Sequence, residues 1–380
     1  MPTQACRVCG GALFGKPLLH YGNMPSSAQN FPDAASLAGE TGAGLTVRQC
    51  SCCGLVQLEN DPVPYYKEVI RAAAVSPVLR DLKTRQFAEF IRKYSLRGKK
   101  IVEIGCGRGE FLGLLPPLGI DAFGLEYSEA AVRDCLKAGL KAGRGYPDAG
   151  MPPLAEGPFD AFLLLMFLEH MPDPNSALKA LSANLKEGAV GLVEVPNFDM
   201  LVRANLFSEF IGDHLLYFTR ETFLATLNLN GFEVLDCAEL RDGYVLSAEV
   251  RKRAPLDLSG FTGRQAEITA GLNAFLSRFG EKKVAVWGAG HQALAVLALA
   301  ELGGKVRYVV DSAPFKQGKF TPATHLPVVP PDALRSDPVE AVIVMAASYS
   351  DEVAGLLRRD FPPGLQVAIL RDHGLEIPGA

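Results

Sequence analysis

Strand-like apolar runs alternate with helical stretches through the middle of the chain. Four such runs lie at residues 101–104, 122–125, 159–167 and 191–195. This alternation predicts a mostly parallel sheet with helices on both faces. Two later runs, at 232–235 and 245–250, are separated by too few residues for a helical crossover. We therefore expect them to form an antiparallel end to the same sheet.

The pattern breaks at Arg251-Lys252-Arg253-Ala254-Pro255, and a second α/β series follows. Its strand candidates lie at 284–287, 306–310, 341–345 and 367–370, with helical patterns at 262–279 and 293–302. This series predicts a smaller doubly wound, Rossmann-like sheet. A further helical pattern at 65–94 precedes the first series, and Pro77 is expected to break it.

The first sixty residues lack sustained periodicity and hold five of the eight cysteines. Cys6 and Cys9 form one C-x-x-C pair, and Cys50 and Cys53 form a second. Two such pairs can place four thiolates tetrahedrally around one zinc ion. Because four sulfur ligands leave no open position for an activated water, this zinc would be structural. Disulfides, a redox site and a metal cluster are the alternatives.

These changes of pattern predict an α/β protein of three domains. Residues 1–62 would form a zinc-binding module, 63–253 a sheet domain with a helical lead-in, and 254–380 a Rossmann-like domain. Hydrophobic residues make up 48% of the 380 residues and charged ones 21%, which is typical of proteins that fold around large cores.

Charge and hydropathy indicate which kinds of partner the protein can bind. The net charge of -4 predicts no general attraction to nucleic acid or to anionic lipid. The start of the chain lacks a basic segment followed by an apolar run, and the most apolar segments are far shorter than the roughly 18 to 20 residues of a membrane span. We therefore expect a cytoplasmic protein that acts on a small molecule. The pattern does not predict an oligomeric state.

A glycine-rich turn follows the strand run 101–104. Gly105, Gly107 and Gly109 are spaced G-x-G-x-G, and a helix is expected to begin near Glu110. Glycines let a ligand come close to the backbone. The spacing differs from the G-x-G-x-x-G of dinucleotide binders, and the acidic Glu103 precedes it on the strand, so the pattern argues against NAD.

Glu126 ends the next strand run, where a carboxylate can accept hydrogen bonds from ribose hydroxyls. Together with the glycine turn and Asp160, which opens a later strand, it resembles the class I S-adenosylmethionine (SAM)-dependent methyltransferase fold over roughly residues 63–250. The resemblance implies that the cofactor is bound by Glu103, Gly105, Gly107, Gly109 and Glu126.

Two segments carry candidate catalytic residues. His170 follows the run 159–167, at the sheet edge where ligands of open α/β sheets lie. It either faces the substrate or shapes its loop by bonding backbone groups. Asp213 and His214 lie among apolar residues, where a carboxylate beside an imidazole can be tuned to take a proton near neutral pH.

The whole chain looks like the three-domain sugar C-methyltransferases, which act on nucleotide-linked keto-deoxysugars. The most distinctive match is in the last domain, at residues 286–290 and 309–328. The family assigns catalysis to a Tyr-x-Glu-His segment that corresponds to residues 211–214, and to a further histidine at the position of His170. His214 thus matches the base, Asp213 replaces the glutamate, and Ile211 replaces the tyrosine.

The resemblance implies that His214 removes a proton next to a ketone and that the resulting carbanion takes the methyl group of SAM. The lost tyrosine at Ile211 keeps a SAM-dependent O- or N-methyltransferase as an alternative. A zinc-bearing scaffold that binds a nucleotide without turnover is a third. In the last domain, the turn 288–293 with Asp311 matches a dinucleotide fingerprint, which leaves NAD binding, substrate contact and packing open.

Overall fold

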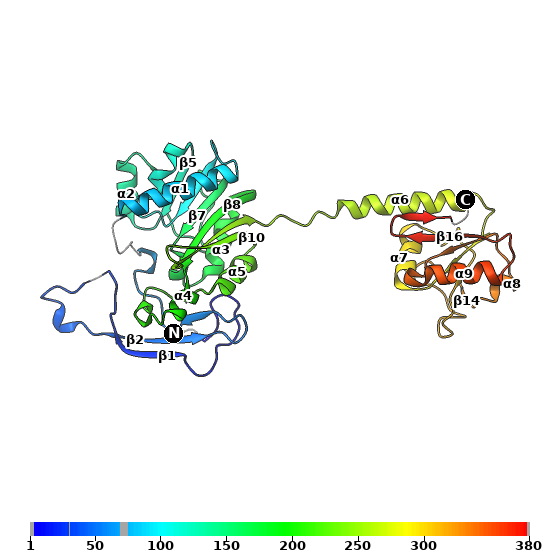
Figure 1. Cartoon of the computed structure of the whole chain (residues 1–380), viewed down its shortest axis with the longest axis horizontal. Helices are drawn as coiled ribbons and strands as arrows, with labels where there is room; N and C mark the ends of the chain where they lie inside the picture. Colours follow the sequence, from blue (N-terminus) through cyan, green and yellow to red (C-terminus); the bar gives the residue numbers. More distant parts are fainter. Residues whose placement is uncertain (1–3, 30, 69–74, 378–380) are drawn as a thin grey trace. The chain divides into compact units, whose positions relative to one another are not determined.

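The structure is a computed structural model of the chain and describes residues 4–29, 31–68 and 75–377. It consists of two compact units, Met1–Ala254 and Pro255–Ala380 (Figure 1). The finer division of the first unit into residues 1–62 and 63–253 stays a prediction, and its two parts share one compact unit.

A seven-stranded sheet forms the centre of the first unit, in the order β10-β11-β8-β7-β4-β5-β6. Its strands are β4 (Lys100–Ile104), β5 (Asp121–Glu126), β6 (Lys141–Arg144), β7 (Phe159–Leu165), β8 (Leu185–Pro196), β10 (Phe232–Leu240) and β11 (Val245–Lys252). Strands β8, β7, β4, β5 and β6 are parallel, whereas β11 and β10 are antiparallel. The predicted mixed sheet with an antiparallel end is confirmed.

Helices cover both faces of this sheet (Figure 1). They are α1 (Pro77–Lys93), α2 (Glu129–Lys137), α3 (Pro174–Ala183) and α5 (Arg220–Leu229), and the short α4 (Phe198–Arg203) follows the end of β8. Along β4, Val102 and Ile104 pack in a core that includes α3 and α5, while Ile101 packs in a second core with α1. A parallel sheet buried on both faces explains the nearly continuous apolar strands.

Of two local predictions, one is confirmed and one needs correction. The helical pattern is interrupted at Pro77, as expected, and α1 begins there, because the missing N–H costs nothing at the first helical position and Ser76 caps the helix through the N–H of Leu79. The helix expected near Glu110 is replaced by two short 3₁₀ turns, Leu112–Leu114 and Pro116–Leu118. Prolines at 116 and 117 remove the N–H donors that an α-helix would need there.

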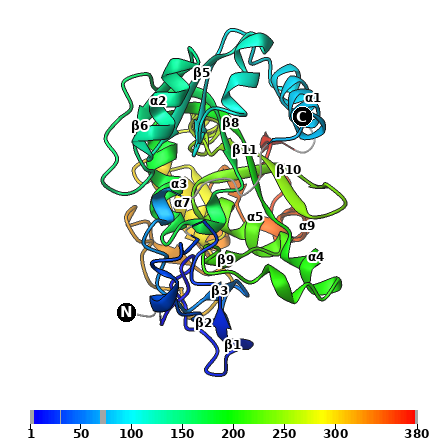
Figure 2. The same ribbon diagram turned by 90° about the vertical axis from the view of Figure 1, so that its left-hand side faces the viewer.

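A smaller antiparallel sheet joins the N-terminal segment to the middle of the chain. It has the order β1-β2-β3-β9 and consists of β1 (Leu19–Met24), β2 (Ala43–Gln49), β3 (Val56–Leu58) and β9 (Leu216–Tyr217). Figure 2 shows β9 beside β3, and in the register Gln57 lies opposite Leu216. The cysteine-rich segment therefore shares a sheet with the residues that directly follow His214.

The second unit holds a six-stranded sheet in the order β14-β13-β12-β15-β16-β17. Its strands are β12 (Val284–Trp287), β13 (Val309–Val310), β14 (Val328–Val329), β15 (Ala341–Val344), β16 (Gln366–Arg371) and β17 (Gly374–Glu376), and its helices are α6 (Ser259–Leu276), α7 (His291–Leu299), α8 (Ala333–Ser336) and α9 (Ser350–Asp360). All pairs but β16–β17 are parallel, so the predicted second α/β domain is confirmed.

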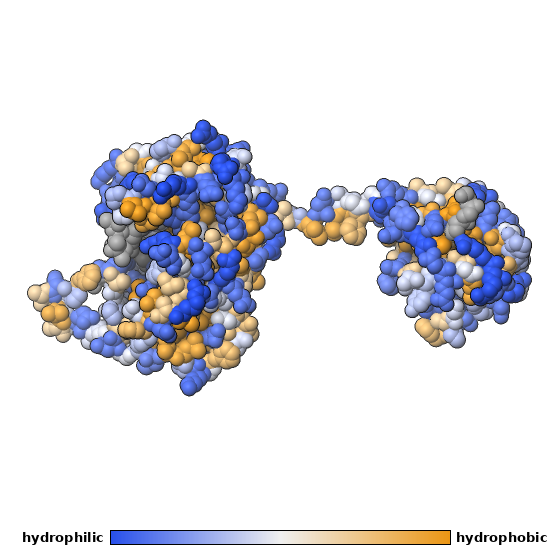
Figure 3. Space-filling model, viewed as in Figure 1, coloured by the Kyte–Doolittle hydropathy of each residue, from blue (hydrophilic) through white to orange (hydrophobic). Residues whose placement is uncertain are grey.

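The surface mixes polar and apolar residues on the face seen in Figure 3. Leu256, Leu258 and Phe261, at the start of the second unit, are exposed. Within the described residues, no helix is long and apolar enough to cross a membrane.

Candidate active site and metal centre

The four predicted zinc ligands converge. The Sγ atoms of Cys6, Cys9, Cys50 and Cys53 all lie within 4.8 Å of one another, and none of these cysteines forms a disulfide. The Cys6–Cys53 and Cys9–Cys50 sulfur pairs are 3.6 and 3.5 Å apart. A tetrahedral site with Zn–S bonds of about 2.3 Å needs sulfurs about 3.8 Å apart. The donor set therefore fits zinc.

Backbone N–H groups point at these sulfurs. Val8 and Cys9 donate to Sγ of Cys6, and Cys52 and Cys53 donate to Sγ of Cys50, over 3.3 to 3.5 Å. Burial raises the pKa of the Cys50 thiol, but these hydrogen bonds outweigh it and lower the pKa to about 7. At Cys50 the donors thus stabilise the thiolate, which is the form that binds metal, whereas at Cys6 burial outweighs them and raises the pKa to about 11.

The three glycines of the turn after β4 have different neighbours. Their φ angles are +69° at Gly105, +56° at Gly107 and +88° at Gly109. A Cβ on Gly105 would meet the ring of Phe167 at 2.8 Å, and one on Gly109 would meet Leu140 at 2.5 Å. In the described chain, a Cβ on Gly107 would meet only the end of one flexible side chain, at 3.2 Å. Packing thus requires glycine at 105 and 109, whereas Gly107 leaves its backbone open to a ligand.

The carboxylate of Glu126 reaches this turn from the end of β5. It accepts hydrogen bonds from the N–H of Gly107, at 3.0 Å, and from the N–H of Ser128, at 2.8 Å. Burial raises the pKa of Glu126, although the N–H donors oppose the shift. Each carboxylate oxygen keeps a second lone pair, so ribose hydroxyls can still donate to it.

A buried tyrosine beside the turn has an unused hydroxyl. In the described part of the chain, Oη of Tyr146 has no hydrogen-bond partner. Its ring contacts those of Tyr66, Tyr127 and Phe167, of which Tyr127 follows Glu126 in sequence and Phe167 packs on Gly105. A buried polar atom left without a partner indicates a missing polar ligand. Together with the open Gly107, this fits an adenosine cofactor.

The predicted catalytic histidines lie in direct contact. His170 ends the 3₁₀ turn Leu168–His170, and its ring centroid is 4.6 Å from that of His214, with the rings at 74°. Nδ1 of His170 donates to the backbone carbonyl of Asp213 over 2.8 Å, so its neutral form carries the lone pair on Nε2. That Nε2 is 3.9 Å from Oε1 of Glu169.

Burial sets the protonation of this cluster. It lowers the pKa of His170, and together with the neighbouring His170 it lowers the pKa of His214 well below the usual 6.5. It raises the pKa of Glu169 to about 8. Near pH 7 both imidazoles are therefore neutral and Glu169 holds its proton. Opposite shifts in adjacent groups are typical of acid–base sites.

The carboxylate of Asp213 forms no hydrogen bond or ion pair with His214 in the described structure. Its Oδ1 accepts a hydrogen bond from Oη of Tyr65 at 2.9 Å. Tyr217 does not replace the tyrosine missing at Ile211 either, because its hydroxyl is bonded to the backbone of Ile211 itself. A tyrosine hydroxyl does reach Asp213, but it comes from Tyr65, which the sequence did not predict as part of the site.

Phe167 connects the cofactor turn to the histidines. Its ring packs on Gly105 and lies 6.4 Å, centroid to centroid, from His170. Of the other predicted residues, Glu103 is buried in β4, directly before the turn. Glu169 was also missed as a functional residue, although it adjoins His170, because its burial is not visible in the sequence.

The glycine turn of the second unit is closed by its own neighbours. A Cβ on Gly288 would meet the carbonyl oxygen of Met345 at 2.5 Å. The carboxylate of Asp311 accepts hydrogen bonds from the N–H of Ala289 and from Lys316, both at 2.9 Å. Although burial opposes it, these bonds lower the pKa of Asp311. Of the three interpretations of this turn, NAD binding, substrate contact and packing, these contacts favour packing.

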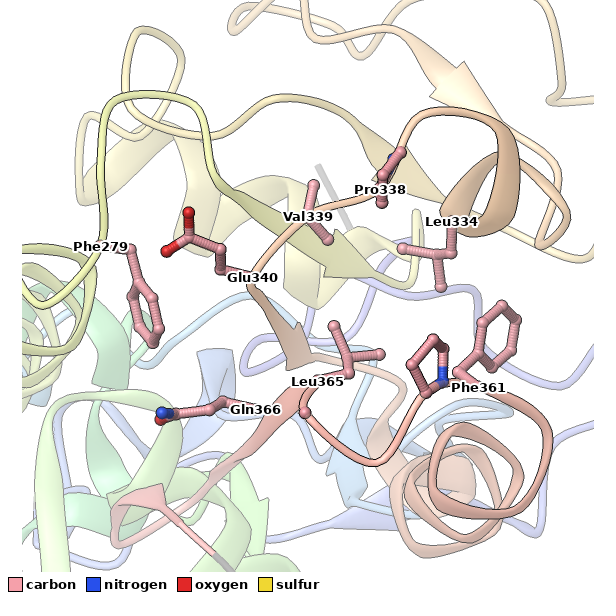
Figure 4. A pocket seen from close by; sticks show the side chains of 10 residues that line it. Phe279, Leu334, Pro338, Val339, Glu340, Phe361, Leu365 and Gln366 are labelled. Carbon is pink, nitrogen blue, oxygen red and sulfur yellow. The ribbon is translucent and has the colours of Figure 1, made fainter.

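The second unit also contains a cavity of about 420 Å³ (Figure 4). Glu340 and Gln366 line one part of it, and Leu334 and Phe361 line another. Glu340 directly precedes β15 and Gln366 begins β16, so the cavity lies at the amino ends of the strands. Ligands of open α/β sheets bind at the opposite, carboxyl ends.

Two family models match separate parts of the chain. The methyltransferase domain matches residues 75–236 and the C-methyltransferase C-terminal domain matches residues 248–361. The chain is a SAM-dependent methyltransferase. The class I methyltransferase fold predicted from the glycine turn is confirmed, and the pairing of domains is that of a C-methyltransferase.

Three individual proteins are similar to this chain, in whole or in part. C-methyltransferase NovU of Streptomyces niveus is 24% identical over 93% of this chain and 91% of its own. The ubiquinone biosynthesis O-methyltransferase of Bordetella avium (strain 197N) is 30% identical over 25% of this chain and 41% of its own. A solved SAM-dependent methyltransferase from Clostridium acetobutylicum ATCC 824 is 14% identical, with a TM-score of 0.40 over 50% of this chain and 96% of its own.

Proposed function

We propose that this methyltransferase moves the methyl group of SAM to the carbon beside the ketone of a nucleotide-linked keto-deoxysugar. The observation that carries the proposal is the neutral, partly exposed His214, packed against His170, which Phe167 connects to the cofactor turn. The match to the C-methyltransferase C-terminal domain and the similarity to NovU support carbon as the acceptor.

The first task of the site is to hold the cofactor. Glu126 would accept the ribose hydroxyls, Gly107 would let the cofactor approach its backbone, and Tyr146 would offer its hydroxyl. Glu103 would border the site from β4. Bound SAM supplies an electrophilic methyl group with a good leaving group.

The second task is to make carbon nucleophilic. Oxygen and nitrogen have lone pairs, but a carbon next to a ketone must first lose a proton. Because its pKa lies below 6.5, His214 is unprotonated at neutral pH and can take that proton. His170, whose ring is fixed by the carbonyl of Asp213, packs against it and holds its orientation.

In this proposal Asp213 holds other residues in place and takes no part in proton transfer. Its carboxylate bonds Tyr65 and its carbonyl bonds His170, so it joins three segments of the site. Zinc bound by Cys6, Cys9, Cys50 and Cys53 would stabilise the fold of the N-terminal segment. Structural zinc sites contribute on the order of 10 kcal/mol to the folding of small modules.

An O-methyltransferase is the second candidate. The hydroxyl expected at position 211 is absent, and the ubiquinone biosynthesis O-methyltransferase of Bordetella avium matches part of this chain. Such an enzyme would transfer the methyl group without removing a proton from carbon.

Solvent exchange separates the two candidates. Incubation with S-adenosylhomocysteine (SAH) and keto-sugar nucleotides in D2O should bring deuterium into the position beside the ketone, because His214 removes that proton reversibly. The His214→Asn variant should lose this exchange while its affinity for SAH, measured by calorimetry, stays unchanged. Exchange at the wild-type rate in the variant would exclude His214 as the base.

A further inference from the structure

Arg7 lies inside the first zinc-binding pair, between Cys6 and Cys9. Its guanidinium donates to two backbone carbonyls, that of Asn60 at 2.8 Å and that of Pro172 at 3.2 Å. Asn60 follows β3, and Pro172 follows the turn that carries Glu169 and His170. One charged side chain of the cysteine-rich segment thus joins two distant segments of the fold.

A second contact reaches the same catalytic segment. The carbonyl of Val8 accepts a hydrogen bond from the side chain of Asn175 at 2.6 Å, and Asn175 in turn accepts one from Asn230. Pro172 and Asn175 flank the start of α3, directly after His170. The first cysteine pair therefore holds the loop between His170 and α3 at two points.

A third contact leads to His214. The fully buried Gln57 accepts a hydrogen bond from the N–H of Arg7 at 2.9 Å, and it lies in β3. Strand β3 pairs with β9, and the N–H of Leu58 donates to the carbonyl of Leu215, the residue after His214. The N–H of Leu215 donates to the carbonyl of Glu169, which closes the connection between the two segments.

We propose that Arg7 is a positioning residue for the His170–His214 pair. Metal bound to the four cysteines would fix the backbone on both sides of Arg7, so the metal site would set the geometry of the catalytic histidines as well as stabilise the fold. This inference rests on the proposed function, because it assigns His214 the role of base. It makes no use of the cofactor turn, so cofactor affinity is an independent readout.

The chain offers a matched control for a test of Arg7. Arg48, in β2, also donates to two backbone carbonyls, those of Phe14 and Gly15, but these do not belong to a catalytic segment. Arg48 pairs in addition with the carboxylate of Glu59 at 2.6 Å. Arg48→Met therefore removes at least as many contacts from the N-terminal segment as Arg7→Met, but none to a catalytic segment. Hydrogen bonds to charged groups contribute about 1.5 to 3 kcal/mol, so we expect Arg7→Met to lower kcat about 10- to 100-fold.

The measurements are kcat and KM with a keto-sugar nucleotide, SAH affinity by calorimetry, and zinc content. The inference predicts that Arg7→Met lowers kcat with zinc content and SAH affinity retained, whereas Arg48→Met stays within about twofold of wild type. Arg7→Lys, which keeps the charge but can reach fewer acceptors, should lie between wild type and Arg7→Met.

Two results separate the failure of this inference from that of the proposed function. Wild-type kcat in Arg7→Met, with deuterium exchange lost in His214→Asn, would overturn the role of Arg7 alone. Retained exchange in His214→Asn would overturn the proposed function. If Arg7→Met does not fold, Arg7→Lys decides, and an unchanged kcat in that variant contradicts the inference.

Discussion

The two glycine turns of this protein look alike in sequence and differ in their surroundings. Each follows a buried parallel strand, and each has an acidic residue at or just after the end of the next strand, Glu126 in the first unit and Asp311 in the second. In the first turn Gly107 is open and Glu126 keeps lone pairs for a ligand. In the second, a carbonyl closes on Gly288 and Lys316 pairs with Asp311.

The difference teaches that a fingerprint predicts a fold better than it predicts a ligand. Glycine is needed wherever the backbone takes a positive φ or passes close to another chain segment, and a bound cofactor is only one such neighbour. Whether the carboxylate already has a cationic partner is the more informative feature, and it becomes visible only in the structure.

The largest expected effect is a loss of SAH affinity when the carboxylate of the first turn is removed, compared with removal of the carboxylate of the second. Glu126→Ala should weaken SAH binding at least about 100-fold, because two hydrogen bonds to a charged group are lost. Asp311→Ala should leave SAH affinity unchanged, since Lys316 and the backbone already use that carboxylate. Calorimetry on both variants checks this contrast, and equal losses would contradict it.

The next effect concerns the stability of the two turns. Gly288→Ala places a Cβ 2.5 Å from a carbonyl oxygen, so it should destabilise the second unit by about 3 kcal/mol. Gly107→Ala should cost only about 1 kcal/mol from its positive φ, yet weaken SAH binding. Denaturant unfolding of each variant measures both values. A larger loss at 107 would mean that its open side is filled by protein.

The sequence predicted more of the fold than of the site. The apolar runs predicted every strand of the central sheet except β6 and every strand of the second unit's sheet except β14 and β17, but they did not predict the small N-terminal sheet. The spacing of the cysteines predicted that four thiols far apart in sequence come together, and they do. The prediction of a helix near Glu110 was wrong because Pro116 and Pro117 prevent an α-helix even where the spacing of apolar residues suits one.

The parts of the site that the sequence did not predict depend on contacts between segments far apart in sequence. Tyr65 meets Asp213 across 148 residues, and β9 joins the N-terminal sheet through only two residues, so neither leaves a local pattern. Glu169 was overlooked because its shifted pKa comes from burial, which only the folded chain defines.

A smaller effect tests the acid–base assignment in the first unit. The pKa of Glu169 is raised to about 8, so the folded chain keeps a proton that the unfolded chain releases above the ordinary value of 4.5. Stability should therefore fall as pH rises from 4.5 towards 8. Glu169→Gln cannot ionise, so its stability relative to wild type should rise over this range, by at least about 1 kcal/mol.

Free energies of unfolding at pH 5, 6, 7 and 8 give this comparison directly. Glu340→Gln, in the second unit, serves as the control. A difference between Glu169→Gln and wild type that does not change with pH would show that Glu169 is ionised in the folded protein.

The atom that receives the methyl group tests the central claim most directly. Wild-type protein, SAM carrying a ¹³C-methyl group and a panel of nucleotide-linked keto-deoxysugars should yield a product whose labelled methyl is bonded to the carbon beside the ketone, as seen by carbon–proton correlation NMR. A labelled methyl bonded to oxygen or nitrogen would contradict the account.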